Sequence, residues 1–106
     1  MTSDPPAHLP PEVLREWLQE VVSLLGVDQQ IDPDRDIGAI LDLTRHVSHT
    51  VVRPAGPLTM FALGLRLGAN LGPGEAVGPA LADLDPQIRD LATNQGRAMI
   101  EQWREQ

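Results

Sequence analysis

The chain has 106 residues, no cysteine and a formal net charge of −7. This length suits one domain, and the lack of cysteine excludes disulfides, thiolate metal sites and cysteine nucleophiles. The acidic charge argues against nucleic-acid binding, because contacts with phosphate groups need a basic surface. Aromatic residues are limited to Trp17, Phe61 and Trp103, and this composition favours aliphatic helix packing over a sheet.

The sequence predicts neither a signal peptide nor a membrane anchor. Residues 1–11 have no basic region followed by an apolar run, which a secretory signal would need. The longest apolar segment, residues 58–71, contains Arg66 and is too short to cross a bilayer. We therefore expect a cytoplasmic protein without membrane contact. Residues 1–9 predict a disordered tail, which leaves residues 10–106 as a single helical domain.

The first predicted helix begins at the proline pair of residues 10 and 11, because proline at a helix start loses no hydrogen bond. Its apolar residues recur at helical spacing as far as Leu25. Gly26 suits the left-handed conformation that ends a helix. An acidic loop, residues 27–35, follows, and Asp36 is the predicted cap of the second helix.

The second predicted helix stops before Pro54, because a residue that precedes proline avoids the helical conformation. One face of this helix is predicted to pack in the core; it consists of Ile37, Ile40, Leu41, Thr44, Val47, Ser48 and Val51. At about 100° per residue, Asp42, His46 and His49 fall on the opposite side, which we expect to face solvent. Arg45 lies between the two faces.

The third predicted helix spans residues 57–71 and is apolar on almost every side, which is typical of the buried centre of a bundle. Residues 72–74, Gly-Pro-Gly, end it. Residues 78–84 predict a short helical turn, and the Asp-Pro pair at 85 and 86 predicts the start of the fourth helix. The apolar stripe of that helix consists of Ile88, Leu91, Ala92, Met99, Ile100 and Trp103.

The sequence therefore predicts an all-α fold. We expect a compact bundle of four main helices with short connections and a flexible N-terminal tail. No internal repeat and no alternating strand pattern occurs in the chain.

The elbow between the second and third helices, residues 52–59, is the first candidate site. Amides of residues 58–60 lack acceptors in a helix that starts at residue 57, and the helix dipole makes this end positive. The candidate anion- or partner-binding residues are Arg45, His49, Arg53, Leu58 and Thr59. Such a cluster suits a phosphate or a carboxylate. The structural alternative is that Arg53 binds the last carbonyl groups of the second helix and Pro54 merely ends it.

Asp42, His46 and His49 form a second candidate site. Side chains at this helical spacing can converge on a metal ion, yet no fourth ligand is indicated, and a solvated helix face commonly carries these residue types. The acidic loop lacks the central glycine and the terminal glutamate of a calcium loop. We therefore expect no bound metal and no cofactor.

Gly64, Gly68 and Gly72 recur every four residues along the third helix. Small residues at this spacing let another backbone approach closely, either within the bundle or across a dimer. We favour packing within the chain and leave the oligomeric state open. Trp103 is a candidate for an exposed contact patch, although core burial is the usual role of tryptophan.

Three segments carry a resemblance to a known family: residues 41–49, LDLTRHVSH, residues 51–59, VVRPAGPLT, and residues 61–64, FALG. They resemble a small actinobacterial domain family of uncharacterised function, found alone or associated with molybdenum cofactor guanylyltransferase. The resemblance extends from about Glu12 to Trp103. The family pattern falls here on His49, Arg53, Pro54, Pro57, Leu58 and Thr59. It implies a helical accessory domain with a protein partner in molybdenum cofactor metabolism.

This chain has no glycine-rich nucleotide loop after a strand, so it is not itself the transferase. We therefore expect a small non-enzymatic accessory or interaction domain, linked to molybdopterin-guanine dinucleotide biosynthesis through the resemblance. The alternative is a small-molecule or anion-binding domain, for phosphate or nucleotide, that uses the elbow from Arg53 to Thr59. A deep pocket with Arg53 facing inward would favour a ligand, whereas exposed apolar residues rimmed by charge would favour a protein partner.

Overall fold

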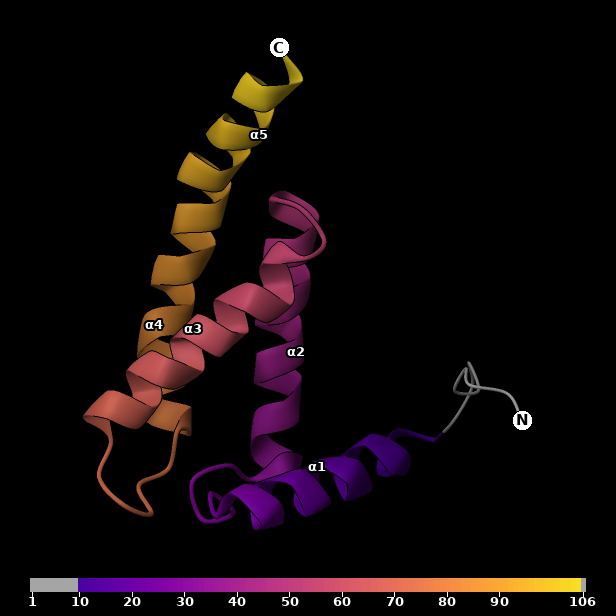
Figure 1. Cartoon of the computed structure of the whole chain (residues 1–106), viewed down its shortest axis with the longest axis vertical. Helices are drawn as coiled ribbons and strands as arrows, with labels where there is room; N and C mark the ends of the chain where they lie inside the picture. The colour runs from indigo at the N-terminus through magenta and orange to yellow at the C-terminus, as the bar shows by residue number, and fades with distance from the viewer. Residues whose placement is uncertain (1–9, 106) are drawn as a thin grey trace.

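The computed structural model of the protein describes residues 10–105, and these contain helices but no strand. In chain order the elements are α1 (Pro11–Leu25), α2 (Pro33–Thr50), α3 (Ala55–Asn70), α4 (Gly78–Leu91), a π-helical segment η1 (Ala92–Gly96) and α5 (Arg97–Arg104). The last three run on as one rod (Figure 1). The all-α prediction with four main helices is confirmed. The predicted tail, residues 1–9, lies outside the described residues.

Helix α1 begins and ends where the sequence indicates. It starts at Pro11, and Gly26 takes a left-handed conformation with φ of 72°. The amide of Gly26 donates to the carbonyl oxygen of Ser23 at 3.2 Å, and that of Val27 donates to Val22 at 2.9 Å. These bonds use carbonyl groups that the end of a helix leaves without partners.

Helix α2 begins four residues earlier than predicted, and its cap is Asp32 rather than Asp36. The Asp32 carboxylate accepts from the amides of Asp34 at 2.9 Å and Arg35 at 3.4 Å, while Pro33 occupies the first helical position. The Asp36 carboxylate turns back to accept from the Asp32 amide at 2.8 Å. The Asp32 carboxylate thus caps the first amides of the helix, and the Asp36 carboxylate caps the amide of Asp32, a reciprocal arrangement like that of a capping box.

Asp36 is a buried carboxylate, with 2% of its surface exposed, and it is held by Arg35. Arg35 donates to both of its oxygens, from Nε at 2.9 Å and from an Nη at 3.0 Å. These bonds lower the pKa of Asp36 below its usual value of 3.8, against the opposing effect of burial, and the Asp32 amide lowers it further. The ionised carboxylate therefore stabilises the fold.

We expect this stabilisation to depend on pH. A folded-state pKa below that of the unfolded chain means that the contribution is complete above about pH 4 and is lost as the pH falls through the folded-state pKa. Urea unfolding from pH 6 to pH 2 should show a smaller acid loss of unfolding free energy in Asp36→Asn than in the native chain. Equal losses in the two proteins would contradict the role of the Asp36 carboxylate.

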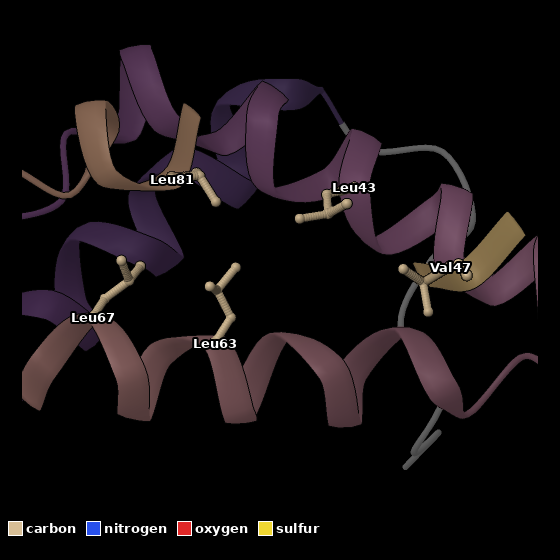
Figure 2. Packing of buried hydrophobic residues seen from close by; sticks show 6 residues of the cluster. Leu43, Val47, Leu63, Leu67 and Leu81 are labelled. Atoms are coloured by element: carbon tan, nitrogen blue, oxygen red, sulfur yellow. The ribbon is translucent and has the colours of Figure 1, made fainter. Parts of the chain in front are cut away.

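The core lies where α2, α3 and α4 meet, and α2 is its central element. The buried apolar residues of this core are Leu43, Val47, Leu63, Leu67, Leu81 and Ala92. In Figure 2 the side chains of Leu43 and Leu81 point toward those of Leu63 and Leu67 across the space between the helices. Leu43 has no exposed surface, although it lies outside the predicted apolar face. Because α2 contacts α1, α3, α4 and η1, its buried arc is wider than one stripe.

Helix α3 is not the buried centre that its composition predicts. Only Gly56, Leu63 and Leu67 are buried in it, and α2 covers that one side. In Figure 1 it crosses in front of α2 and α4, and no described element crosses in front of it. An apolar composition on all sides means that a helix can be buried on every side, but in the single chain another helix covers only one side of α3.

The C-terminal rod also differs from the prediction, because Asp85 and Pro86 lie inside α4 rather than before a new helix. Proline removes one backbone donor from a helix interior. Asp85 nevertheless makes a helical ion pair with Arg89, four residues on, at 2.6 Å. Helix α4 begins at Gly78, and the amide of Val77 holds its start to the Gln30 carbonyl oxygen at 2.9 Å.

The helices are arranged in an open rather than a closed manner. Helix α1 lies across the start of α2, and α5 extends beyond the point where α2 ends (Figure 1). Only Val22 of α1 is buried, and no residue of α5 is. The Cα radius of gyration is 15.8 Å, against about 13 Å for a closed domain of 100 residues. Helices α1 and α5 therefore keep much of their apolar surface outside the core.

Candidate functional site

The elbow between α2 and α3 closes on itself through backbone hydrogen bonds. The hydroxyl of Ser48 donates to the Arg53 carbonyl oxygen at 2.9 Å. Helix α3 starts at Ala55, two residues before the predicted start. The amide of Ala55 donates to the Val52 oxygen at 3.0 Å, and those of Gly56 and Leu58 donate to the Arg53 and Pro54 oxygens at 3.4 Å. The Leu58 amide, predicted to be free for an anion, thus has an acceptor within the chain.

The five predicted anion-binding residues divide into two groups. Arg45 and His49 line a shallow polar recess of about 400 Å³, together with Asp42, His46, Thr50 and Arg89. Arg53, Leu58 and Thr59 do not line this recess. Arg53 and Leu58 are exposed, and Thr59 is half-buried. The fold therefore does not gather the five side chains around one ligand position, and the anion site stays a prediction.

His46 differs from its predicted place on a solvated face. Its side chain is half-buried, and its Nε2 is shielded from solvent with no hydrogen-bond partner among the described residues. The reason is the rod: Arg89 of α4 lines the same recess and covers this side of α2. Asp42 and His49 are exposed. Within residues 10–105 no group of three histidine or acidic side chains is placed to hold a metal ion.

Arg89 is a member of the recess that the sequence analysis did not single out. Its guanidinium pairs with the Asp85 carboxylate at 2.6 Å, and this hydrogen bond raises the pKa of Arg89 above its usual value. The spacing of Asp85 and Arg89, four residues apart on one helix, was the signal available in the sequence. Because Asp85 was predicted to start a new helix, its ion pair with Arg89 within one helix was not expected.

Helix α1 carries exposed apolar residues along one side. We call it the α1 face; it consists of Val13, Leu14, Trp17, Leu24 and Leu25, each more than two fifths exposed. These residues share one side of the helix at the spacing expected for an amphipathic segment. Trp17 stands near the middle of the face with 64% of its surface exposed. Val22 is the one buried residue of helix α1, so most of the apolar side chains of this helix lie outside the core.

Helix α3 presents a second apolar face, on the side opposite Leu63 and Leu67. We call it the outer α3 face; it consists of Leu58, Phe61, Ala62, Gly64, Leu65, Gly68 and Ala69, all exposed. A Cβ atom at Gly64 or Gly68 would meet nothing within 4 Å. The expectation that Gly64 and Gly68 let another backbone of the same chain approach closely is therefore wrong.

A family model described as Domain of unknown function (DUF6457) matches residues 9–106. The chain belongs to this family. The match covers all the residues that form the helices, the elbow and the two apolar faces. No curated protein and no solved structure matches the chain. The geometry of this DUF6457 chain therefore has to supply the argument about its function.

The DUF6457 chain also has an apolar groove of about 250 Å³ beside the outer α3 face. It is lined by Val27, Gln30, Ile31, Ile40, Met60, Leu63, Gly64, Leu67, Gly68, Leu71, Val77 and Leu81. Gln30 is the one side chain with polar atoms among them, apart from the thioether of Met60. The groove opens where Gly64 and Gly68 have no side chains, so it continues the outer α3 face toward α4.

Helix α5 of the DUF6457 chain carries Trp103 with 70% of its surface exposed, near Met99 at 55%. Trp103 therefore belongs to the surface, as one of the two predictions for it proposed, and not to the core.

Among the described helices none is both long enough and apolar enough to cross a membrane.

Proposed function

We propose that this DUF6457 chain is a non-enzymatic accessory domain that binds another protein through the α1 face. The observation that supports this proposal is the exposure of Trp17 and its four apolar neighbours on one side of one helix. Single exposed apolar residues are ordinary, but a contiguous apolar patch rimmed by polar residues marks an interaction surface. Tryptophan is also enriched among the residues that dominate binding energies.

The charges around the α1 face indicate the chemistry of the partner. Glu12, Glu16 and Glu20 recur every four residues along α1, and all three are exposed. Arg15, the one basic residue of the helix, already pairs with Asp34 of α2 at 3.0 Å. The rim of the face is therefore acidic. A matching partner carries an apolar groove or helix with arginine or lysine at its edge, because opposite rim charges speed association and select the partner.

The resemblance found in the sequence proposes where to look first. It links families of this kind to molybdenum cofactor guanylyltransferase, so that enzyme from the same organism is the first partner to test. A regular position of the gene beside genes of molybdenum cofactor synthesis would add support. Random placement of the gene would remove the reason for choosing this partner and leave the α1 face as the basis of the proposal.

The elbow has less support as an anion site than the α1 face has as a protein site. Three amides at the start of α3 have backbone acceptors, so they are less available to a phosphate. Arg53 is exposed and lines no shared recess with Arg45 and His49. We therefore place phosphate or nucleotide binding second.

The proposal is tested with Trp17→Glu, which places a charge at the centre of the α1 face. Because Trp17 is largely exposed, the variant should keep the helix content and unfolding free energy of the native chain. Its affinity for the purified guanylyltransferase, measured by isothermal titration calorimetry, should fall at least roughly 30-fold, as expected for a central interface tryptophan.

The matched control is Leu91→Glu, on α4, where the leucine is 60% exposed and lies outside both apolar faces. It should bind as the native chain does. Binding that survives Trp17→Glu but fails in Arg53→Ala would move the site to the elbow. No binding by the native chain would refute the guanylyltransferase as partner.

A further inference from the structure

The outer α3 face differs from the α1 face in charge. Residues 55–71 contain no acidic residue, and Arg66 is their one charge, whereas α1, α2, α4 and α5 each carry at least one aspartate or glutamate. Two copies of a chain with a net charge of −7 repel each other over most of their surfaces. A second copy is therefore accepted best at the one helix that has no acidic side chain.

A dimer contact on α3 leaves the α1 face free for the partner considered above, because the two faces lie on different helices.

Along the outer α3 face, bulky side chains lie toward one end and small side chains toward the other. The face is therefore complementary in shape to a second copy of itself that runs in the opposite direction. The bulky residues Leu58 and Phe61 lie in the first half, and Gly68 and Ala69 lie in the second. An antiparallel pairing about a two-fold axis places the bulky half of each helix on the small half of the other. Close helix approach at small residues is a known mode of helix association.

We propose that two copies of the chain pair antiparallel through their outer α3 faces. With the axis crossing α3 between residues 63 and 64, Leu58 of one copy faces Ala69 of the other, and Leu65 faces Ala62. Phe61 of each copy then falls between Gly64 and Gly68 of the other, where the apolar groove of about 250 Å³ opens. Its ring fills a cavity that the single chain leaves uncovered. This pairing goes beyond the proposed function and does not depend on it.

The test is sedimentation equilibrium of the full chain over a range of concentrations. The native chain should show twice its monomer mass. Phe61→Glu should show the monomer mass, with a dissociation constant raised at least roughly 30-fold and an unchanged circular dichroism spectrum, because Phe61 is 71% exposed. Should that variant fold poorly, Gly68→Leu serves the same purpose, since a Cβ atom at this position meets nothing within 4 Å in its own chain and the larger side chain occupies the edge of the groove.

A control variant and an exchange variant test whether the two copies pair in this arrangement. Leu24→Glu, at an 85% exposed position of the α1 face, should leave the dimer intact. Ala69→Leu should weaken the dimer, and Leu58→Ala combined with Ala69→Leu should restore it, because the bulky and small positions are then exchanged. A native chain that stays monomeric would overturn the pairing while leaving the α1 proposal standing. A dimer that survives Phe61→Glu and Gly68→Leu, or one broken by Leu24→Glu, would also overturn it.

Discussion

Replacement of Leu43 by alanine should lower the free energy of unfolding by about 2–5 kcal/mol, the range observed for leucines in well-packed cores. Leu43 has no exposed surface, and its side chain points from the central helix toward Leu63 of α3 and Leu81 of α4. Its removal leaves a cavity against two helices at once, which α2 cannot close by shifting toward either one. Chemical unfolding in urea, followed by circular dichroism, gives the value.

The matched control is Leu41→Ala, two residues away on the same helix, where the leucine is 42% exposed. This variant should lower the free energy of unfolding by less than about 1 kcal/mol, as most changes at exposed sites do. Equal losses of unfolding free energy for Leu41→Ala and Leu43→Ala would contradict the wide buried surface of α2 and favour the apolar face predicted from the sequence.

Gly56→Ala should destabilise the chain by about 3 kcal/mol or more, an overpacking effect at the upper end of the usual range. Gly56 is buried where the start of α3 contacts Thr44 and Ser48 of α2. A Cβ atom there would lie 2.7 Å from the carbonyl oxygen of Thr44 and would collide with the Ser48 hydroxyl. The oxygen belongs to the backbone of α2, so the elbow has to open and the bond from Ser48 to Arg53 is lost. Thermal and urea unfolding measure the loss.

Gly38→Ala is the control for this effect. Gly38 is an exposed glycine within α2, and a Cβ atom there would meet nothing within 4 Å. Alanine is the better helix former, so this variant should stabilise the chain by about 0.5–1 kcal/mol. If Gly56→Ala were stabilising as well, the close contact between the two helices at the elbow would be wrong.

Helix ends were predictable wherever one residue type decides the local geometry. Gly26 ends α1, and Pro54 marks the elbow, because each restricts the backbone by itself. The start of α2 was predicted at the wrong aspartate, since Asp32, Asp34 and Asp36 all have the right chemistry for a cap. Only the hydrogen bonds show that Asp32 caps the amides and Asp36 turns back with Arg35.

The continuous rod was missed for a related reason. An aspartate followed by proline is a common helix start, but the same pair occurs inside α4. Periodicity alone cannot separate two short helices from one long helix whose proline lies on the outside, where Pro86 is exposed.

The positions of the helices relative to one another were beyond the sequence. The apolar pattern of α3 predicts that much of its surface is buried, yet it does not say whether the same chain or another molecule covers it. Leu58, Phe61 and Leu65 are each about two thirds exposed or more. The prediction was thus right about the chemistry of α3 and wrong about its place. The same holds for the candidate site: His49 and Arg53 are near in sequence, but only His49 lines the polar recess.

The accessibility of Trp17 to acrylamide tests most directly the claim that the α1 face is open for a partner. Trp103→Phe leaves Trp17 as the single indole, since the chain has two tryptophans. The fluorescence of this variant should be red-shifted and quenched nearly as strongly as that of free tryptophan. It should become shielded when the partner is added. A blue-shifted emission that acrylamide hardly quenches in the purified chain would mean that the α1 face is already covered, and the proposed function would lose its basis.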